Sequence, residues 1–239
     1  MKYRLANQYE ESFIKENIMG PNPIKLLEQL IYKQTISKCD TLLDLGCGRG
    51  VTSIFLAKET GARVFAADLW ITPTENKKRF EQSGFTTQQI IPLKAEAHQL
   101  PFAEEFFDMV VSVDSYHYFG LDQTYLGEHL LPLVKRGGFL LIAVPGFKKD
   151  IHNNLPKEMM LSWSPEDLET MHDIPYWKQI IACTEGVEIV SIHEMEDAEE
   201  CWNDWLACDN EYAQNDRAAM QAGAGKYMNF IAIILRRQV

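Results

Sequence analysis

Residues 42–50 read Leu-Leu-Asp-Leu-Gly-Cys-Gly-Arg-Gly. A short apolar run ends in an acid, and three glycines at alternate positions, Gly46, Gly48 and Gly50, come directly after it. The residues that follow, 51–58, are compatible with a helix. Because glycines that turn a strand into a helix let a ligand approach the backbone, this stretch predicts a nucleotide-binding loop.

The chain around this loop predicts an α/β architecture. Strand candidates lie at 41–45, 63–67, 89–93, 107–113, 139–144, 187–193 and 227–235, and helix candidates at 51–60, 73–83, 122–135 and 197–221. Strands that alternate with helices form crossover units, and several of these strands are apolar nearly throughout. We therefore expect a seven-stranded, mostly parallel sheet with helices on both faces.

The two ends of the chain predict helical additions to the sheet. Residues 1–38 read as amphipathic helices that break at Gly20-Pro21-Asn22-Pro23, and we expect them to form an N-terminal helical lid. Residues 39–239 would be the main domain, with a helical insertion at about 197–222 before the last strand. The whole chain is expected to behave as effectively one domain.

Composition excludes several classes of protein. The 239 residues carry a net charge of −11, which argues against a nucleic-acid partner because phosphate binding needs clustered Lys and Arg. No apolar run approaches the ~20 residues that span a bilayer, and no secretory signal is recognisable. The five cysteines have no paired spacing, which is typical of reduced thiols in the cytoplasm. No standard metal-ligand spacing occurs, so no metal is expected.

Three features decide which nucleotide fits the loop. Val51 stands where the dinucleotide fingerprint has its third glycine, so the NAD interpretation loses support. The loop also lacks the Gly-Lys-Ser/Thr of a phosphate-binding loop. Asp68 ends the second strand, where an acid can accept hydrogen bonds from ribose hydroxyls.

With these residues in place, the chain resembles the class I S-adenosylmethionine-dependent methyltransferases, which have a Rossmann-like fold. The stretch 43–50 matches the first motif of that family, and Asp68 matches its ribose-binding acid. Residues 95–102, Ala-Glu-Ala-His-Gln-Leu-Pro-Phe, resemble its adenine-binding landmark, and 106–110 resemble the opening of its fourth strand. The similarity covers roughly residues 20–145. It is greatest to the small-molecule branch that includes the ubiquinone/menaquinone C-methyltransferases.

The resemblance implies a cofactor, S-adenosyl-L-methionine, whose product is S-adenosyl-L-homocysteine. The residues that it assigns to this cofactor are Asp44, Gly46, Cys47, Gly48, Asp68, Leu69, Glu96, Ala97 and Asp114. Asp44 would orient the loop or hold the ammonium group, and Leu69 would offer an apolar face to adenine. Glu96 stands where the family usually has Asp, but its longer arm can still reach the exocyclic amine.

Catalytic and substrate-binding candidates follow the fourth strand, because ligands bind at the carboxyl ends of strands in open α/β sheets. His117 is a candidate general base and Tyr116 a candidate orienting group; for His117, a packed or surface histidine is an equal alternative. Tyr118, Trp163 and Trp202 are candidate substrate contacts, and core packing is the alternative for the two tryptophans.

The sequence thus predicts an S-adenosylmethionine-dependent methyltransferase acting on a small molecule. The alternatives are a non-catalytic or sensor protein that binds the same cofactor, a protein or RNA methyltransferase, and an NAD-dependent oxidoreductase. The acidic charge and the absence of an Asn/Asp-Pro-Pro-Tyr/Phe motif disfavour a protein or RNA substrate. The acceptor, the methylated atom and the oligomeric state are not readable from the sequence.

Overall fold

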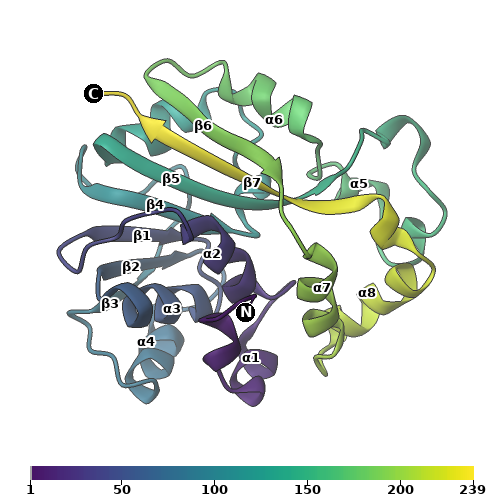
Figure 1. The fold of residues 1–239 in the computed structure, drawn as a ribbon, viewed down its shortest axis with the longest axis horizontal. Helices are drawn as coiled ribbons and strands as arrows, with labels where there is room; N and C mark the ends of the chain where they lie inside the picture. The colour runs from purple at the N-terminus through teal and green to yellow at the C-terminus, as the bar shows by residue number, and fades with distance from the viewer. Residues whose placement is uncertain (1) are drawn as a thin grey trace.

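The computed structural model describes residues 2–239 and is built on one sheet with the strand order β3-β2-β1-β4-β5-β7-β6 (Figure 1). The strands are β1 (Thr41–Leu45), β2 (Arg63–Asp68), β3 (Ile90–Lys94), β4 (Phe107–Val113), β5 (Val134–Phe147), β6 (Val187–Glu194) and β7 (Met228–Arg237). Strands β1 to β5 pair in parallel, and β7 is antiparallel to both β5 and β6. The predicted seven-stranded, mostly parallel sheet is confirmed.

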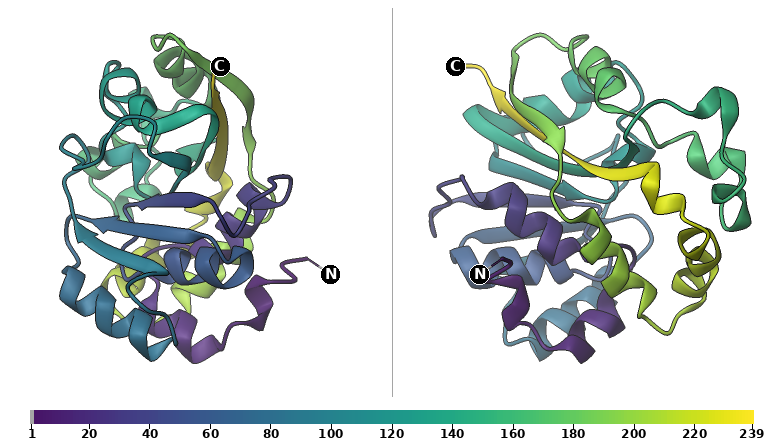
Figure 2. Two further views of the ribbon diagram at one scale, coloured as in Figure 1. Left: turned by 90° about the vertical axis from the view of Figure 1, so that its left-hand side faces the viewer. Right: turned by 45° about the vertical axis from the view of Figure 1, so that its right-hand side comes forward.

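Eight α-helices accompany the sheet in the described chain. They are α1 (Glu11–Asn17), α2 (Pro23–Ile31), α3 (Val51–Thr60), α4 (Pro73–Gln82), α5 (Pro165–Leu168), α6 (Ile174–Ile181), α7 (Ala198–Leu206) and α8 (Glu211–Gln221). Helices α7 and α8 lie between β6 and β7 in the sequence, and α7 packs beside α2 of the N-terminal segment (Figure 2). The insertion before the last strand is therefore adjacent to the start of the chain.

Local capping chemistry explains where the helices begin. The Asn22 side chain accepts hydrogen bonds from the backbone N–H groups of Ile24 and Lys25, and Pro23 opens α2. Thr72 and Glu75 form a reciprocal capping box at the start of α4. Ser164 and Asp167 do the same for α5, so the predicted helix start at Ser164-Pro165 is confirmed.

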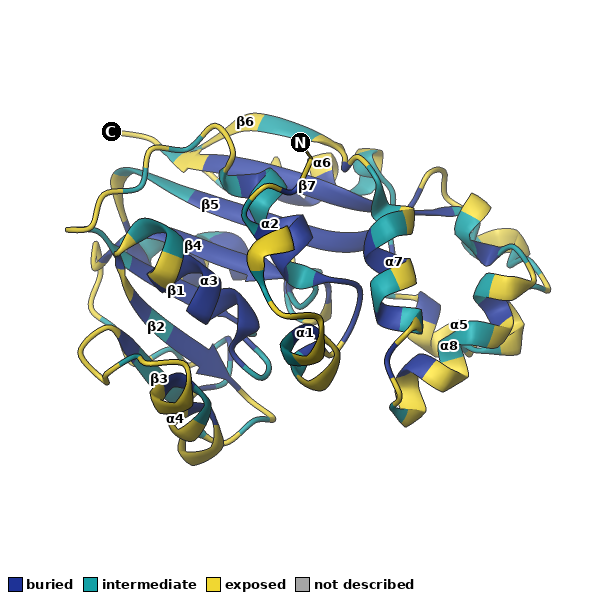
Figure 3. Cartoon of the chain, turned by 60° about the horizontal axis from the view of Figure 1, so that its bottom comes forward, coloured by how far each residue is buried: buried dark blue, intermediate teal, exposed yellow. Residues whose placement is uncertain are grey.

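The sheet packs between two apolar layers. Its central strands are mostly buried (Figure 3). One face packs against α2, α3 and α7, where Leu27, Phe55 and Trp205 are buried. The other face packs against α6 and the short helical turns after β4, with Tyr125 and Trp177 fully buried. Because helices cover both faces, a ligand site is expected at the carboxyl ends of the strands.

Two predicted helices were wrong in extent. Residues 122–135 form a π-helical turn at Leu126–Leu130 and a 3-10 turn at Leu131–Leu133, and β5 begins immediately afterwards. Pro132 lacks the N–H that a continuing helix needs. The helix expected over 197–221 is divided into α7 and α8, because the Asn210 side chain accepts a hydrogen bond from the Ala213 N–H, 2.9 Å away, and starts a new helix there.

Candidate functional site

A cavity of about 320 Å³ lies where β1, β2 and β4 end. The strand order reverses direction between β1 and β4, and this is the point at which open α/β sheets bind ligands. The wall contains every residue predicted for the cofactor except Asp44. Those wall residues are Gly46, Cys47, Gly48, Asp68, Leu69, Glu96, Ala97 and Asp114.

The glycine loop is shaped by backbone conformations that disfavour side chains. Gly46 has φ +76° and its Cβ position is occupied by the Ser115 side chain, so only glycine fits there. Gly48 has φ +52° and faces the Met19 sulfur. Its N–H donates to Asp68 Oδ2 over 2.8 Å, which joins the loop to the end of β2.

Asp44 lies beneath the loop and outside the cavity wall as described. Its Oδ2 accepts hydrogen bonds from the hydroxyls of Thr52 and Ser53, each at 2.6 Å, at the start of α3. Its Oδ1 is buried without a partner among the described residues. Burial raises the pKa of Asp44 to about 6. These contacts favour the loop-orienting role over direct contact with an ammonium group.

Asp68 is held by three backbone N–H groups. Besides the bond from Gly48, its Oδ1 accepts from the N–H groups of Trp70 and Ile71, both at 2.8 Å. A carboxylate has about four acceptor positions, so one remains on Oδ2 for a ligand hydroxyl. The carboxylate is buried but lines the cavity. This arrangement fits a single strong ribose contact.

Glu96 and Ala97 form the opposite wall. The Glu96 carboxylate accepts hydrogen bonds from the His98 N–H at 3.0 Å and faces the His98 ring nitrogen at 2.8 Å. The side-chain hydrogen bond from His98 lowers the pKa of Glu96, so the carboxylate is charged at neutral pH. It is therefore available as an acceptor for an exocyclic amine.

The segment after β4 lines another part of the cavity. Asp114 has φ +56°, a left-handed conformation that is uncommon for this residue, and its carboxylate lies beside Gly20 of the N-terminal segment. Burial, followed by the charge of Asp216, raises the pKa of Asp114 to about 8. Tyr118 also lines the wall, with its ring 5.8 Å from that of Trp70.

The two predicted catalytic residues lie away from this wall. Tyr116 and His117 are both buried, and neither is among the described residues that line the cavity. Burial lowers the pKa of His117 to about 3, and its Nδ1 has no partner in the described chain. Burial also raises the pKa of Tyr116. These environments fit core packing better than proton transfer.

The N-terminal segment covers the cavity from above. Asn17 to Pro21 contribute to its wall, and the Arg49 guanidinium donates to the Glu16 carbonyl oxygen over 2.7 Å. Met19 lies over the glycine loop, with its sulfur next to Gly48. Tyr9 is not among the described wall residues: its hydroxyl donates to Glu59 over 3.1 Å, and its ring packs on Phe55.

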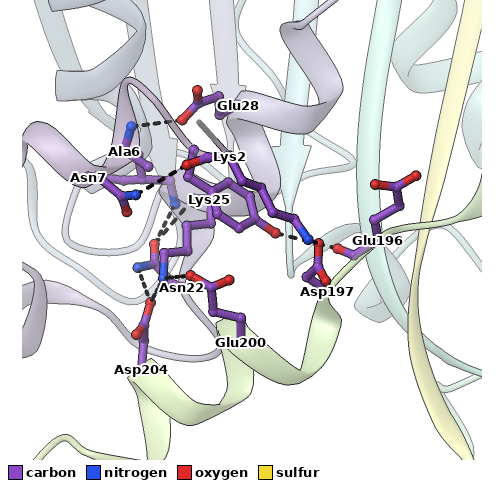
Figure 4. Close-up of polar contacts among 12 residues, drawn as sticks. Lys2, Ala6, Asn7, Asn22, Lys25, Glu28, Glu196, Asp197, Glu200 and Asp204 are labelled. Carbon is purple, nitrogen blue, oxygen red and sulfur yellow. Dashed lines mark hydrogen bonds and ion pairs between the residues drawn. The ribbon is translucent and has the colours of Figure 1, made fainter.

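A polar cluster joins this segment to α7 (Figure 4). The Lys25 ammonium lies 2.6 Å from the Glu200 carboxylate and 2.7 Å from that of Asp204. Asn22 donates to Asp204 over 2.8 Å, and its backbone N–H donates to the Cys201 carbonyl oxygen. The chain that turns over the cavity is thus fixed to the helical insertion.

The insertion contains a carboxylate that sequence reasoning missed. Asp216 of α8 accepts a hydrogen bond from Trp163 Nε1 at 2.9 Å and another from Trp205 Nε1 at 2.8 Å. Trp202 packs edge-on against Trp163 at 6.0 Å. In the part of the chain described, neither Trp163 nor Trp202 lines the cavity at the strand ends; Trp202 lines a second cavity, of about 980 Å³, next to α7. No local pattern identifies Asp216, because its partners come from different segments.

Comparisons with known proteins agree with this geometry. The family model described as "Methyltransferase domain" matches residues 43–142, from β1 into β5. Among solved structures, phosphoethanolamine N-methyltransferase 2 of Haemonchus contortus, in complex with S-adenosyl-L-methionine, has a TM-score of 0.72, 17% identity and coverage of 97% of this chain and 58% of its own. Geranyl diphosphate C-methyltransferase of Streptomyces coelicolor has a TM-score of 0.67, 15% identity and coverage of 97% and 78%. The Rossmann-like methyltransferase fold is confirmed.

Curated relatives match shorter stretches. The methyltransferase GfsG of Streptomyces halstedii is 29% identical over 50% of this chain and 42% of its own length. The human mitochondrial arginine hydroxylase NDUFAF5 is 41% identical over 32% and 20%. The 2-methyl-6-phytyl-1,4-hydroquinone methyltransferase of Synechocystis is 33% identical over 46% and 33%. The chain thus matches less than half of each of these three relatives.

Within residues 2–239, no helix is long and apolar enough to cross a membrane. In the same part of the chain, no group of three or more His, Cys, Asp or Glu side chains is placed to hold a metal ion.

Proposed function

We propose that this protein binds S-adenosylmethionine and transfers its methyl group to a small molecule. One observation carries the proposal: the predicted cofactor residues other than Asp44, which come from four separate segments of the sequence, line a single cavity. The match of residues 43–142 to the methyltransferase domain supports it. The ubiquinone/menaquinone branch receives support only from the quinone methyltransferase relative, so we leave the branch open.

The chain's own residues fit the cofactor chemically. The loop from Gly46 to Gly48 allows backbone approach to an amino-acid group, and Asp68 keeps one acceptor position for a ribose hydroxyl. Glu96 accepts from the adenine amine, and Leu69 packs on the ring. When bound, the cofactor supplies an electrophilic methyl group on sulfur. The protein then contributes mainly by holding the nucleophile in line with that methyl.

A small acceptor suits the enclosed site. The N-terminal segment covers the cavity, and Arg49 and Lys25 fix this segment to the loop and to α7. We propose residues 1–38 as a lid over a main domain 39–239. The charge of −11 disfavours RNA, and a cytoplasmic location stays a prediction.

A second candidate function is cofactor binding without methyl transfer. It is favoured by one specific observation: a relative that is 41% identical over 76 residues is named an arginine hydroxylase. A similar stretch of 76 residues thus occurs in a protein named for other chemistry. The two candidates share the cofactor and differ only in turnover.

Calorimetry with S-adenosylhomocysteine and NAD⁺ tests the cofactor assignment. We expect S-adenosylhomocysteine to bind and NAD⁺ not to bind. In Asp68→Ala the dissociation constant should rise at least tenfold, about 1.4 kcal/mol. Asp122→Ala, which removes an exposed acid that is not part of the described cavity wall, is the matched control. NAD⁺ binding in place of S-adenosylhomocysteine, or wild-type affinity in Asp68→Ala, would contradict the assignment.

A further inference from the structure

The cavity wall that Tyr118 lines also carries a carboxyl group without a protein partner. Asp114 lies on this wall, and no hydrogen bond or ion pair involves its side chain among the described residues. A polar group at a cavity wall that lacks a protein partner is available to a ligand. Tyr118 adds an aromatic ring to the same wall.

Asp216 is a second carboxylate, and its negative charge acts on both Asp114 and Tyr118. Two indole N–H groups, from Trp163 and Trp205, orient its carboxylate. Its charge raises the pKa of Asp114 and, together with those of Asp114 and Asp167, that of Tyr118. Every charged group that acts on Asp114 or Tyr118 is thus a carboxylate. Arg49 also lines the cavity, but its guanidinium is bound to Glu16 beside the glycine loop.

We propose that the methyl acceptor is an amine that enters as an ammonium cation, pairs with Asp114 in the field of Asp216, and lies against Tyr118. A cation is attracted both by the carboxylates and by the aromatic face. An anionic acceptor would be repelled, and a neutral hydroxyl would leave the carboxylates without a counter-charge. This inference rests on the proposed methyltransferase function and names the substrate class of its site.

Asp114 also accepts a proton from the substrate, because an ammonium nitrogen has no free electron pair with which to attack the methyl group. The ammonium first gives one proton to the Asp114 carboxylate, which becomes a neutral carboxyl group. The amine nitrogen then forms a bond to the methyl carbon with its freed pair, while the pair of the broken sulfur–carbon bond stays on sulfur. The methylated ammonium leaves, and the Asp114 proton passes to water.

The test uses the full chain saturated with S-adenosylhomocysteine. Its probes are matched triads of one carbon skeleton carrying an amine, a hydroxyl or a carboxylate, for example tyramine, 4-(2-hydroxyethyl)phenol and 4-hydroxyphenylacetate, together with shorter alkyl triads. We expect calorimetry to detect amines with at least tenfold preference over their alcohols. Asp114→Asn and Asp216→Asn should each reduce this preference at least tenfold. In Asp216→Asn, whose carboxylate is not part of the described cavity wall, the affinity for S-adenosylhomocysteine should change less than threefold.

Glu211→Gln removes one charge from the first turn of the same helix as Asp216 and is the matched control. It should keep the amine preference. Equal binding of amines and alcohols, preference for carboxylates, no binding of any amine, or an amine preference that survives both Asp variants would overturn the proposal. Failure of S-adenosylhomocysteine itself to bind would instead overturn the proposed function, so the two failures are distinct.

Discussion

Lys25 and Asp204 form an ion pair, with 2.7 Å between Nζ and Oδ2, that joins α2 to α7 (Figure 4). The Lys25 side chain is only 9% exposed. Burial works to lower the pKa of Lys25, but its bonds to Asp204 and Glu200 outweigh that effect, and the net shift is upward. The pair therefore holds the cover of the cavity in place.

Lys25→Met should show that the buried ion pairs of Lys25 contribute more to the free energy of unfolding than a surface ion pair does. Loss of two charged hydrogen bonds at a buried ammonium is expected to reduce the free energy of unfolding by about 1–3 kcal/mol, measured by urea denaturation. Lys15→Met removes a lysine from an exposed pair with Glu11 and should cost less than about 0.5 kcal/mol. Equal losses in the two variants would contradict a special role for Lys25.

Gly20→Ala tests the contact between the N-terminal segment and the segment after β4. A methyl group at residue 20 would meet the Asp114 carboxylate, so the carboxylate must rotate away or one of the two segments must shift. Overpacking of this kind costs about 1–3 kcal/mol, and we expect S-adenosylhomocysteine affinity to fall about tenfold in calorimetry. Gly225→Ala, which meets only the flexible end of Met220, is the control.

A double-mutant cycle makes this prediction specific. Asp114→Gly removes the carboxylate and accepts the positive φ at that position. In that background Gly20→Ala should cost less than about 0.5 kcal/mol in unfolding free energy. A cost that is the same in both backgrounds would show that Gly20 is needed for another reason.

We expect His117 to affect the pH dependence of folding stability and not catalysis. Its pKa is about 3 in the folded chain because of burial, and 6.5 is its ordinary value. Between these values the unfolded chain binds the proton and the native chain does not. Stability is therefore complete above pH 6.5 and decreases as the pH falls toward 3. Between pH 7 and pH 5 this histidine alone should cost about 2 kcal/mol.

Denaturation of His117→Gln at several pH values checks this. The variant should lose about 2 kcal/mol less than the wild type between pH 7 and pH 5. His193→Gln, at an exposed position on β6, should keep the wild-type pH profile. Parallel profiles for wild type and His117→Gln would contradict the burial argument.

The sequence predicted the parts of the fold that depend on local pattern. The predicted strands at 41–45 and 107–113 coincide with β1 and β4, because apolar runs end at glycine or acidic residues there. The glycine loop and Asp68 were predictable for the same reason: strand ends and turn residues are local. The helix expected over 122–135 was wrong, because a proline and tertiary packing outweighed its helical pattern.

The contribution of Asp216 to the proposed acceptor site was not predictable. Asp216 is joined to Trp163 across 53 residues, and Trp205 reaches the same carboxylate from another helix. Periodicity places residues on the face of one element, but it does not say which elements pack together. His117 shows the same limit: a histidine after a strand end resembles a general base until its burial is known.

The amine affinity of the protein saturated with S-adenosylhomocysteine should depend on pH through Asp114. Its pKa is raised to about 8 by burial and by Asp216, and the ammonium pairs with the ionised carboxylate. Below pH 8 the carboxyl must first lose its proton, so affinity should fall about tenfold per pH unit. From pH 8 up to the pKa of the amine itself, the affinity should stay constant.

Asp216→Asn should shift this profile in a defined direction. The groups that act on Asp114 and its neighbour Tyr118 are Asp216 from α8 and Asp167 from α5, both acidic. Removal of the Asp216 charge lowers the pKa of Asp114, so the inflection should move below pH 8 while the plateau affinity drops. Glu211→Gln should leave the inflection in place. An inflection that does not move in Asp216→Asn would mean that the two carboxylates do not share one field, and that Asp114 alone sets the charge of the acceptor site.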